Sequence, residues 1–511
     1  MSIAKIYTAQ GLVTESPIIT VEADVSKGLH SFSIVGLAGK AVDEAKDRVN
    51  SAIKHSGFKA PKNQNHKVII SLAPADIKKD GTGFDLPIAV SYLCATGLVT
   101  IKSPESTLYL GELALDGSLR PIKGILGAVL SASKAGIKEV IVPMENAKEA
   151  ALVDSVKIIP ASDLKAVIGH ITTETELQQI ITPQPKTFIP NIPENNNRVF
   201  LEDIKGQESA KRALVIAAAG RHNVLLIGPP GTGKTMLARA FQSLLPPLTR
   251  NEALQVTTIH SVAGTLSNIS GQPPFRTPHH TISHTAMVGG GSKPQPGEVT
   301  LAHKGVLFMD EFPEFDRRTL DALRQPLEDR EVSISRVSGS AKFPADFILI
   351  AAMNPHRGQD DGNNDYATVM HETYASKISG PILDRIDLWV EMPHVPYDKL
   401  TTKRKDNNNN ESKLAIEMIG YARHTQSKRL KNRHKNTNSM MSARDIEETV
   451  VMTKDTKDLL REASYKLKLS PRGHHRVIKV ARTIADLDKA DNIAPKHLLE
   501  ALQYRMKVIG S

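Results

Sequence analysis

The chain has 511 residues, of which 40% are hydrophobic and 4% aromatic, and its formal net charge is +10. That length predicts about three domains, at roughly 150 residues each. The single cysteine, Cys94, excludes an intramolecular disulfide and disfavours a cysteine-ligated zinc site. No apolar run reaches the ~18 residues of a membrane span, and the first residues lack the layout of a signal peptide. We therefore expect a cytoplasmic protein with no membrane partner, whose positive charge permits a nucleic-acid partner.

Residues 1–180 alternate between strand and helix patterns. Pro17–Val25 and Val68–Leu72 are short apolar runs that predict strands. Ala41–Ser56 has apolar residues at helical spacing, and Gly124–Lys134 is typical of a helix built from small residues. The pattern predicts a mixed α/β domain.

Two segments of this domain resemble the proteolytic domain of Lon proteases. Asp80–Ala89 is similar to the segment that carries the nucleophilic serine, and Arg120–Ile137 to the segment that carries the lysine. Gly83 stands at the serine position and Leu126 at the lysine position, and neither side chain can act as nucleophile or base. The resemblance implies a Lon-like (ribosomal S5 domain 2-like) α+β fold without peptidase activity.

Residues 181–198 are the predicted linker to a second domain. The stretch contains four prolines and ends in three consecutive asparagines before Arg198. Proline and polar residues at this density are typical of a linker rather than of a helix or strand.

An apolar run, Asn223–Ile227, leads into a phosphate-binding loop of the form G-x-x-x-x-G-K-T, and a helical pattern follows. The loop consists of Gly228, Pro229, Pro230, Gly231, Thr232, Gly233, Lys234 and Thr235. Its glycines let backbone N–H groups surround a polyphosphate, and the helix N-terminus adds favourable partial charge. We expect Lys234 to reach the β- and γ-phosphates and Thr235 to bind Mg²⁺, so the predicted cofactors are ATP and Mg²⁺.

Two later apolar strand patterns end in polar side chains that complete a nucleotide site. The first ends at Asp310, expected to hold the Mg²⁺ shell, and Glu311, expected to polarise the attacking water. The second ends at Asn354, expected to sense the γ-phosphate. The order of phosphate loop, acid pair and asparagine resembles that of AAA+ ATPases. It predicts a P-loop α/β core over residues 199–395.

Arg385 follows the run Gly380–Asp384. In ring-forming AAA+ proteins similar to Mg-chelatase and the MCM helicases, the arginine of this motif enters the site of the neighbouring subunit and stabilises transition-state charge. The alternative is a surface salt bridge with Asp384 or Asp387. If Arg385 acts as such a finger, one subunit cannot complete its own site, and we expect a homo-oligomer, by resemblance a hexamer.

Between the phosphate loop and the acid pair, the chain is longer than the core fold needs. Three histidines there, His279, His280 and His284, invite a metal-site hypothesis, but no cysteine or nearby acid at ligand spacing completes it. We favour a helix interrupted by the glycines of Gly289–Gly291. This arrangement resembles the channel-facing insertion of the Mg-chelatase and MCM clade.

Ser333–Phe343 alternates around a Ser-Gly turn and predicts a β-hairpin, at the place where that clade carries a second pore hairpin. Three basic residues of these segments are candidates for contact with a DNA backbone in the channel: Lys293, Arg336 and Lys342. The alternative for each is a solvated surface charge.

Residues 396–511 are predicted to form a helical lid. Residues 401–440 contain ten Lys or Arg and three Asp or Glu, so +7 of the total +10 lies in this basic segment. The segment is either a nucleic-acid footprint or a solvated basic face. An arginine at the start of the helix after Ser470 can reach a γ-phosphate from the lid. Family position favours Arg472 for this role, with Arg476 as the alternate.

Several short segments outside the nucleotide site extend the resemblance over nearly the whole chain. They are Val35–Leu37, Leu72–Asp76, Gly111–Gly117 and Ala481–Leu487. The chain resembles the YifB/ComM family of bacterial Mg-chelatase-like AAA+ proteins with a Lon-like front domain. The resemblance implies a hexameric ring that hydrolyses ATP while moving on DNA, and branch migration of recombination intermediates in natural transformation. The alternatives are a Mg-chelatase-type motor subunit acting on a tetrapyrrole and a non-motor regulatory AAA+ ATPase.

Overall fold

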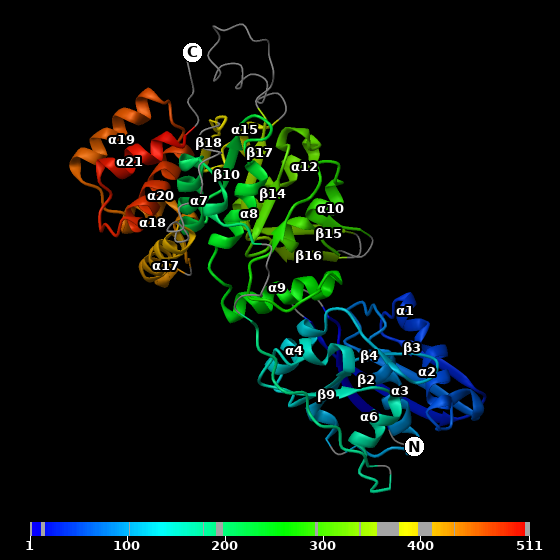
Figure 1. Ribbon diagram of the computed structural model, residues 1–511. Helices are drawn as coiled ribbons and strands as arrows, with labels where there is room; N and C mark the ends of the chain where they lie inside the picture. Colours follow the sequence, from blue (N-terminus) through cyan, green and yellow to red (C-terminus); the bar gives the residue numbers. More distant parts are fainter. Residues whose placement is uncertain are drawn as a thin grey trace. The chain divides into compact units, whose positions relative to one another are not determined.

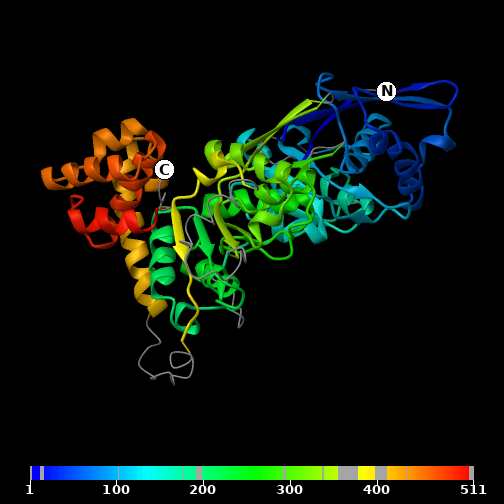
Figure 2. The same ribbon diagram turned by 90° about the horizontal axis from the view of Figure 1, so that it is seen from above.

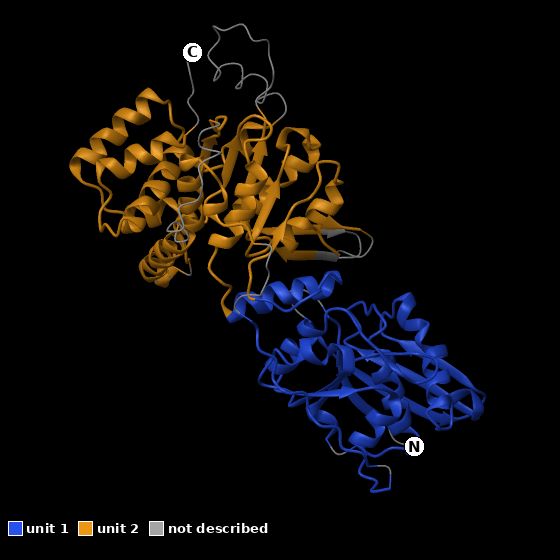
Figure 3. Cartoon of the chain, in the orientation of Figure 1, with its two compact units in different colours: residues 1–190, 250–270 blue, residues 191–249, 271–511 orange. Residues whose placement is uncertain are grey.

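The computed structural model describes residues 3–11, 16–101, 103–176, 178–190, 198–291, 295–336, 339–354, 378–396, 411–433 and 435–505. Contacts within the chain divide it into two compact units (Figure 3). Unit 1 comprises residues 1–190 and 250–270, and unit 2 comprises residues 191–249 and 271–511.

Unit 1 is a mixed α/β fold built on a seven-stranded sheet in the order β3-β4-β2-β1-β5-β8-β9 (Figure 1). The strands are β1 (Ala4–Ala9), β2 (Ile18–Lys27), β3 (Ser31–Val35), β4 (His66–Ala73), β5 (Thr107–Tyr109), β8 (Glu139–Pro143) and β9 (Lys157–Ala161). β2 runs antiparallel to both β1 and β4, and the remaining neighbours are parallel. The main helices are α2 (Ala45–His55), α3 (Asp85–Ala95), α4 (Ile125–Lys134) and α6 (Leu164–Ile171), so the strands and helices expected here are confirmed.

The two positions of unit 1 that correspond to a Lon dyad carry no reactive group. A Cβ atom added to Gly83 would lie 3.2 Å from Ile122 Cδ1, and Leu126 is fully buried in α4. The buried carboxylate nearby belongs to Asp85, and it accepts hydrogen bonds of 2.7 and 2.9 Å from Arg48. Asp85 is thus engaged in a structural ion pair at the start of α3.

Helix α9 (Arg250–Ala263) belongs to unit 1, although it follows the phosphate-loop helix in sequence. Ser261 Oγ accepts a 3.0 Å hydrogen bond from the backbone N–H of Gly124, and Arg250 pairs with Asp154 at 2.7 Å. A segment from the middle of the ATPase sequence therefore belongs to the first unit. The boundaries expected from the sequence place this segment within the core of residues 199–395.

Unit 2 contains a five-stranded sheet in the order β11-β14-β17-β10-β18, in which all neighbours are parallel. The strands are β10 (Val224–Ile227), β11 (Phe275–Arg276), β14 (Val306–Met309), β17 (Ile348–Met353) and β18 (Leu388–Glu391). Strand order reverses around β10, which lies between β17 and β18. In open parallel sheets, ligands bind outside the carboxyl ends of the strands at such a switch point. The parallel sheet is consistent with the expected AAA+ core.

Asp346 lies just before β17, at the amino edge of this sheet, and is held by three cations. Its carboxylate lies 3.0 Å from Arg221, 2.8 Å from Arg330 and 2.9 Å from Lys304. Burial by itself raises the pKa of Asp346, but the positive charges of Arg221, Arg330 and Lys304 outweigh that effect and hold the pKa far below its usual range. This cluster joins the segments that precede β10, β14 and β17.

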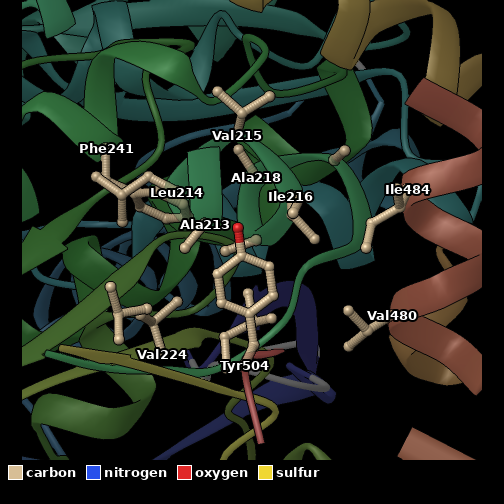
Figure 4. Close-up of a cluster of buried hydrophobic side chains, with 14 of the residues drawn as sticks. Ala213, Leu214, Val215, Ile216, Ala218, Val224, Phe241, Val480, Ile484 and Tyr504 are labelled. Carbon is tan, nitrogen blue, oxygen red and sulfur yellow. The ribbon is translucent and has the colours of Figure 1, made fainter. Parts of the chain in front are cut away.

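The end of the chain forms a helical bundle, gold to red in Figures 1 and 2. Its helices are α17 (Glu411–Leu430), α18 (Ala443–Thr449), α19 (Lys454–Lys466), α20 (Pro471–Leu487) and α21 (Pro495–Gln503). α17 and α20 pack on α7 (Glu208–Gly220) of the core. Figure 4 shows Ile484 and Tyr504 in this apolar cluster with Ala213, and all three are buried. Within the described residues, no helix combines the length and apolarity needed to cross a bilayer.

Part of the basic segment of the lid makes contacts within the chain. Arg423 donates two hydrogen bonds to Ala218 O, Arg429 pairs with Asp486, and Arg433 and Lys435 both pair with Asp445. Lys428 and Lys431 remain exposed. Among the described residues, Arg429, Arg433 and Lys435 thus pair with acids of later helices, and contact of this segment with nucleic acid stays a prediction.

Candidate nucleotide-binding site

The phosphate loop connects the carboxyl end of β10 to helix α8 (Lys234–Leu244). Gly231 and Gly233 have φ angles of 80° and 89°, in the left-handed region that favours glycine. A Cβ atom at either position would meet nothing within 4 Å. Gly228 has a different role, since a Cβ there would lie 2.4 Å from Met392 O. The loop thus curves around an open space at a helix N-terminus, which suits an anion.

Lys234 folds back onto its own loop. Its Nζ donates hydrogen bonds to Gly228 O at 2.7 Å, Pro229 O at 2.9 Å and Asn354 Oδ1 at 2.9 Å. Burial lowers the pKa of Lys234, and the charge of Asp310 opposes that shift. No carboxylate among the described residues forms an ion pair with this amine, so a phosphate would supply the buried cation with a direct counter-charge.

The two predicted Mg²⁺ ligands are brought together. Thr235 Oγ1 donates a 3.0 Å hydrogen bond to Asp310 Oδ2, at the carboxyl end of β14. Within the loop, Thr232 Oγ1 donates to Pro229 O at 2.9 Å, while Pro230 is exposed. Hydroxyl and carboxylate oxygens are the ligands that Mg²⁺ prefers. The residues present therefore fit a triphosphate with its Mg²⁺.

Glu311 faces His280, a contact that the sequence does not reveal. Their Oε2 and Nδ1 atoms are 3.1 Å apart, and the backbone of Glu311 is left-handed with φ of 52°. The ring of His280 lies 4.1 Å from that of His279 and 6.5 Å from that of Phe315, measured between centroids. Among the described residues, no group of three or more His, Cys, Asp and Glu side chains could hold a metal ion, so the three histidines form no such site there. The sequence shows no acidic residue near these histidines at ligand spacing. In the folded chain, Glu311, the candidate catalytic residue, is the acid that lies next to His280.

Arg385 lies far from the phosphate loop of its own chain. The register of β18 on β10 runs from Leu388 opposite Val224 to Glu391 opposite Ile227. The phosphate loop therefore follows the carboxyl ends of these strands, whereas Arg385 precedes their amino ends. Four strand residues span about 13 Å. Arg385 and the phosphate loop therefore lie at opposite edges of the sheet, and a role of Arg385 on another subunit stays a prediction.

Arg472, in the first turn of α20, lies beside Arg385. Both guanidinium groups pair with Glu328, on helix α13 (Arg324–Asp329). Arg476, one turn later, has its Nε 3.8 Å from Asp387 Oδ1. The lid arginines thus lie at the same sheet edge as Arg385, and the prediction that Arg472 senses a γ-phosphate stays a prediction.

The alternative for Arg385, an ion pair with a neighbouring aspartate, is not what the described residues show, since its carboxylate partner is Glu328. Asp387 is instead held by His222 Nδ1 at 3.3 Å and the backbone N–H of Asn223 at 3.2 Å. Burial raises the pKa of Asp387, but the hydrogen bond from His222 and the charge of Arg476 outweigh burial and lower it.

The described residues of the two segments predicted to face a channel have the expected backbone structure, and their place in a channel stays a prediction. β15 (Glu331–Arg336) and β16 (Gly339–Pro344) form the expected antiparallel hairpin. Lys342 on this hairpin is exposed, with its Nζ 3.1 Å from Glu331 Oε1. The side chain of Arg336 and the whole of Lys293 lie outside the described residues.

The glycine segment also follows the expectation. Helix α10 (His284–Val288) ends where β12 (Gly289–Gly290) begins, and β12 pairs with β13 (Gln295–Pro296). Gly289, Gly290 and Gly291 all have positive φ angles, so the turn depends on glycine.

Three family models match successive parts of the chain. "Subunit ChlI of Mg-chelatase" matches residues 21–146, "Magnesium chelatase, subunit ChlI" matches residues 200–400, and "Magnesium chelatase, subunit ChlI C-terminal" matches residues 409–505.

Relatives match along nearly the full length. The "Uncharacterized protein YifB" of Salmonella typhimurium is 42% identical over 509 residues, covering 99% of this chain and 97% of the relative. The "Competence protein ComM" of Haemophilus influenzae is 40% identical over 512 residues, covering 99% and 98%. The "Magnesium-chelatase 38 kDa subunit" of Cereibacter sphaeroides is 26% identical over 175 residues, which is 30% of this chain and 52% of the relative. By these full-length matches, the chain belongs to the YifB/ComM family of Mg-chelatase-like AAA+ proteins.

Proposed function

We propose that this protein is an ATP-driven, ring-forming DNA motor of the ComM type, which promotes branch migration of recombination intermediates in natural transformation. The positions of Arg385 and Arg472 are the observation that supports assembly of several copies into a ring. Both lie at the amino edge of the sheet, while the phosphate loop lies at the carboxyl edge. A head-to-tail contact between copies brings one edge against the other and closes into a ring, for which we propose six subunits.

Within one such site, each residue has a distinct task. Lys234 and the loop N–H groups hold the β- and γ-phosphates of ATP, and Thr235 and Asp310 would hold the Mg²⁺ that would offset the phosphate charge. Glu311 accepts a proton from the attacking water, with His280 fixing the direction of its carboxylate. The guanidinium group of Arg385 from the next subunit stabilises the negative charge that develops on the γ-phosphate in the transition state.

The comparisons favour a DNA substrate over a tetrapyrrole. The magnesium-chelatase subunit corresponds to only 30% of this chain, whereas the relative named as a competence protein corresponds to 99% of it. A competence protein acts where cells take up DNA. The exposed Lys342 on the hairpin is a cation suited to a phosphate backbone in the channel.

ATPase and junction assays on the purified protein test this proposal. We expect the rate per subunit to rise with protein concentration and to rise further with single-stranded, double-stranded or four-way junction DNA. We also expect ATP-dependent conversion of a labelled mobile junction into its exchanged products. Lys234→Ala serves as the control that binds no ATP.

Two results would count against parts of the proposal. An undiminished rate per subunit at dilutions where light scattering shows monomers would remove the shared site. ATP hydrolysis without any junction conversion would favour the non-motor regulatory alternative.

A further inference from the structure

Glu328 forms ion pairs with two arginines that lie far apart along the chain. Its Oε2 pairs with Arg385 Nη2, and its Oε1 accepts a 3.2 Å hydrogen bond from Arg472 Nη2. One arginine belongs to the core and the other to the first turn of the lid helix α20. The side chain of Glu328 is half exposed, at 50%. One acidic side chain thus connects α13, Arg385 and the lid.

The surroundings of Arg385 show how much it depends on this carboxylate. Its side chain is 10% exposed, and its Nη1 donates to Pro381 O at 2.5 Å. Its Nε is buried and has no hydrogen-bond partner among the described residues. Glu328 is therefore the anion that this guanidinium holds while no phosphate of a neighbour is present.

We propose that Glu328 is a positioning residue that occupies Arg385 and Arg472 in the absence of a neighbour's ATP and competes with its γ-phosphate for them. This inference rests on the proposed function. A carboxylate and a phosphate both offer paired oxygens to a guanidinium group, and a given N–H donates fully to one of them. When the γ-phosphate binds the two arginines, the ion pair between Arg472 at the start of α20 and Glu328 on α13 is broken. The neighbour's ATP thereby loosens the lid of the subunit that supplies the arginines.

The solvent exposure of the Glu328–Arg472 ion pair determines how strongly Glu328 is expected to change the apparent affinity for ATP. Arg472 is 60% exposed, so solvent screens its half of the contact. Exposed ion pairs contribute little, so removal of the carboxylate changes the apparent affinity for ATP by about two- to fivefold. The competition ends once the phosphate has the arginines, so it affects KM rather than kcat.

The test is Glu328→Gln, which keeps the shape and removes the charge. We expect the KM for ATP to fall about two- to fivefold with kcat unchanged. The protein concentration that gives half-maximal ATPase activity should fall with it. The matched control is Asp329→Asn, the next residue of α13, which is exposed and forms no ion pair within the described part of the chain.

A second variant connects the effect to the arginines. In an Arg472→Ala background, Glu328→Gln should change KM less than it does in the wild type, because one competing contact is already gone. If Glu328→Gln does not fold, as judged by thermal unfolding, Glu328→Asp replaces it: its shorter side chain cannot reach both arginines, and the same fall in KM is expected.

The outcomes separate this inference from the function on which it rests. An unchanged or higher KM, or a loss in kcat alone, would overturn the competition while leaving the motor intact. A wild-type protein without ATPase activity at any concentration would overturn the motor itself.

Discussion

Mixed rings provide a direct test of whether Arg385 acts on a neighbouring subunit. Arg385→Ala removes the guanidinium but leaves the phosphate loop and Glu311 intact in that chain. Because about 13 Å of strand separates Arg385 from its own phosphate loop, we expect the lost guanidinium group to act in the site of the next subunit. We expect kcat to fall about 10³-fold or more, the range for removal of an arginine that meets the transferred phosphoryl group.

Mixing with a second defective chain should restore activity. Glu311→Gln lacks the base but still supplies Arg385. In rings mixed in equal amounts, about a quarter of head-to-tail contacts join an intact Glu311 to an intact Arg385. The ATPase rate should therefore rise toward about a quarter of the wild-type rate, although each chain alone is inactive.

A matched mixture distinguishes this result from simple exchange. Lys234→Ala and Glu311→Gln both damage the phosphate side of the site, so no contact between these two chains is complete. Copurification of tagged with untagged chains establishes that mixed rings form. If the Arg385→Ala mixture is then no more active than this control, Arg385 does not act in trans.

Three further predictions concern single residues. Glu311→Gln should bind ATP normally and lose about 10²- to 10⁴-fold in kcat, and normal turnover would remove its role as base. Asp346→Asn should lower the free energy of unfolding by about 3–5 kcal/mol at pH 7, because it leaves three partly buried cations without their counter-charge. The pKa of Asp346 is depressed in the folded state. Its stabilisation is therefore present above its unfolded pKa of about 4 and is lost as the pH falls below it, so denaturant titrations of wild type and variant should converge in acid. Lys342→Ala should reduce the slope of log K against log salt for DNA binding by about one, and an unchanged slope would exclude this residue from the phosphate contacts.

The nucleotide site could be read from the sequence because each of its parts is local. Residues 224–235 encode a strand, a turn that needs left-handed backbone and a helix start within a few residues of one another. Asp310 and Asn354 each end an apolar strand, and parallel strands bring their carboxyl ends to one edge of the sheet. The contacts of Thr235 with Asp310 and of Lys234 with Asn354 follow from that rule.

Sequence patterns could not predict which segments that lie far apart along the chain come into contact. Composition shows a basic segment at residues 401–440, but only folding brings Asp445 and Asp486 to its cations. Periodicity predicts helices, but not that residues 250–270 complete the first unit.

The same limit applies at the site. Local pattern determined where ATP is expected to bind, because strand, turn and helix signals act over neighbouring residues. Tertiary structure alone placed His280 against Glu311 and joined Arg385 to Arg472 through Glu328. Such ion pairs depend on how sheet edges and packed helices bring together residues that are far apart along the chain, and no spacing along the chain encodes that distance.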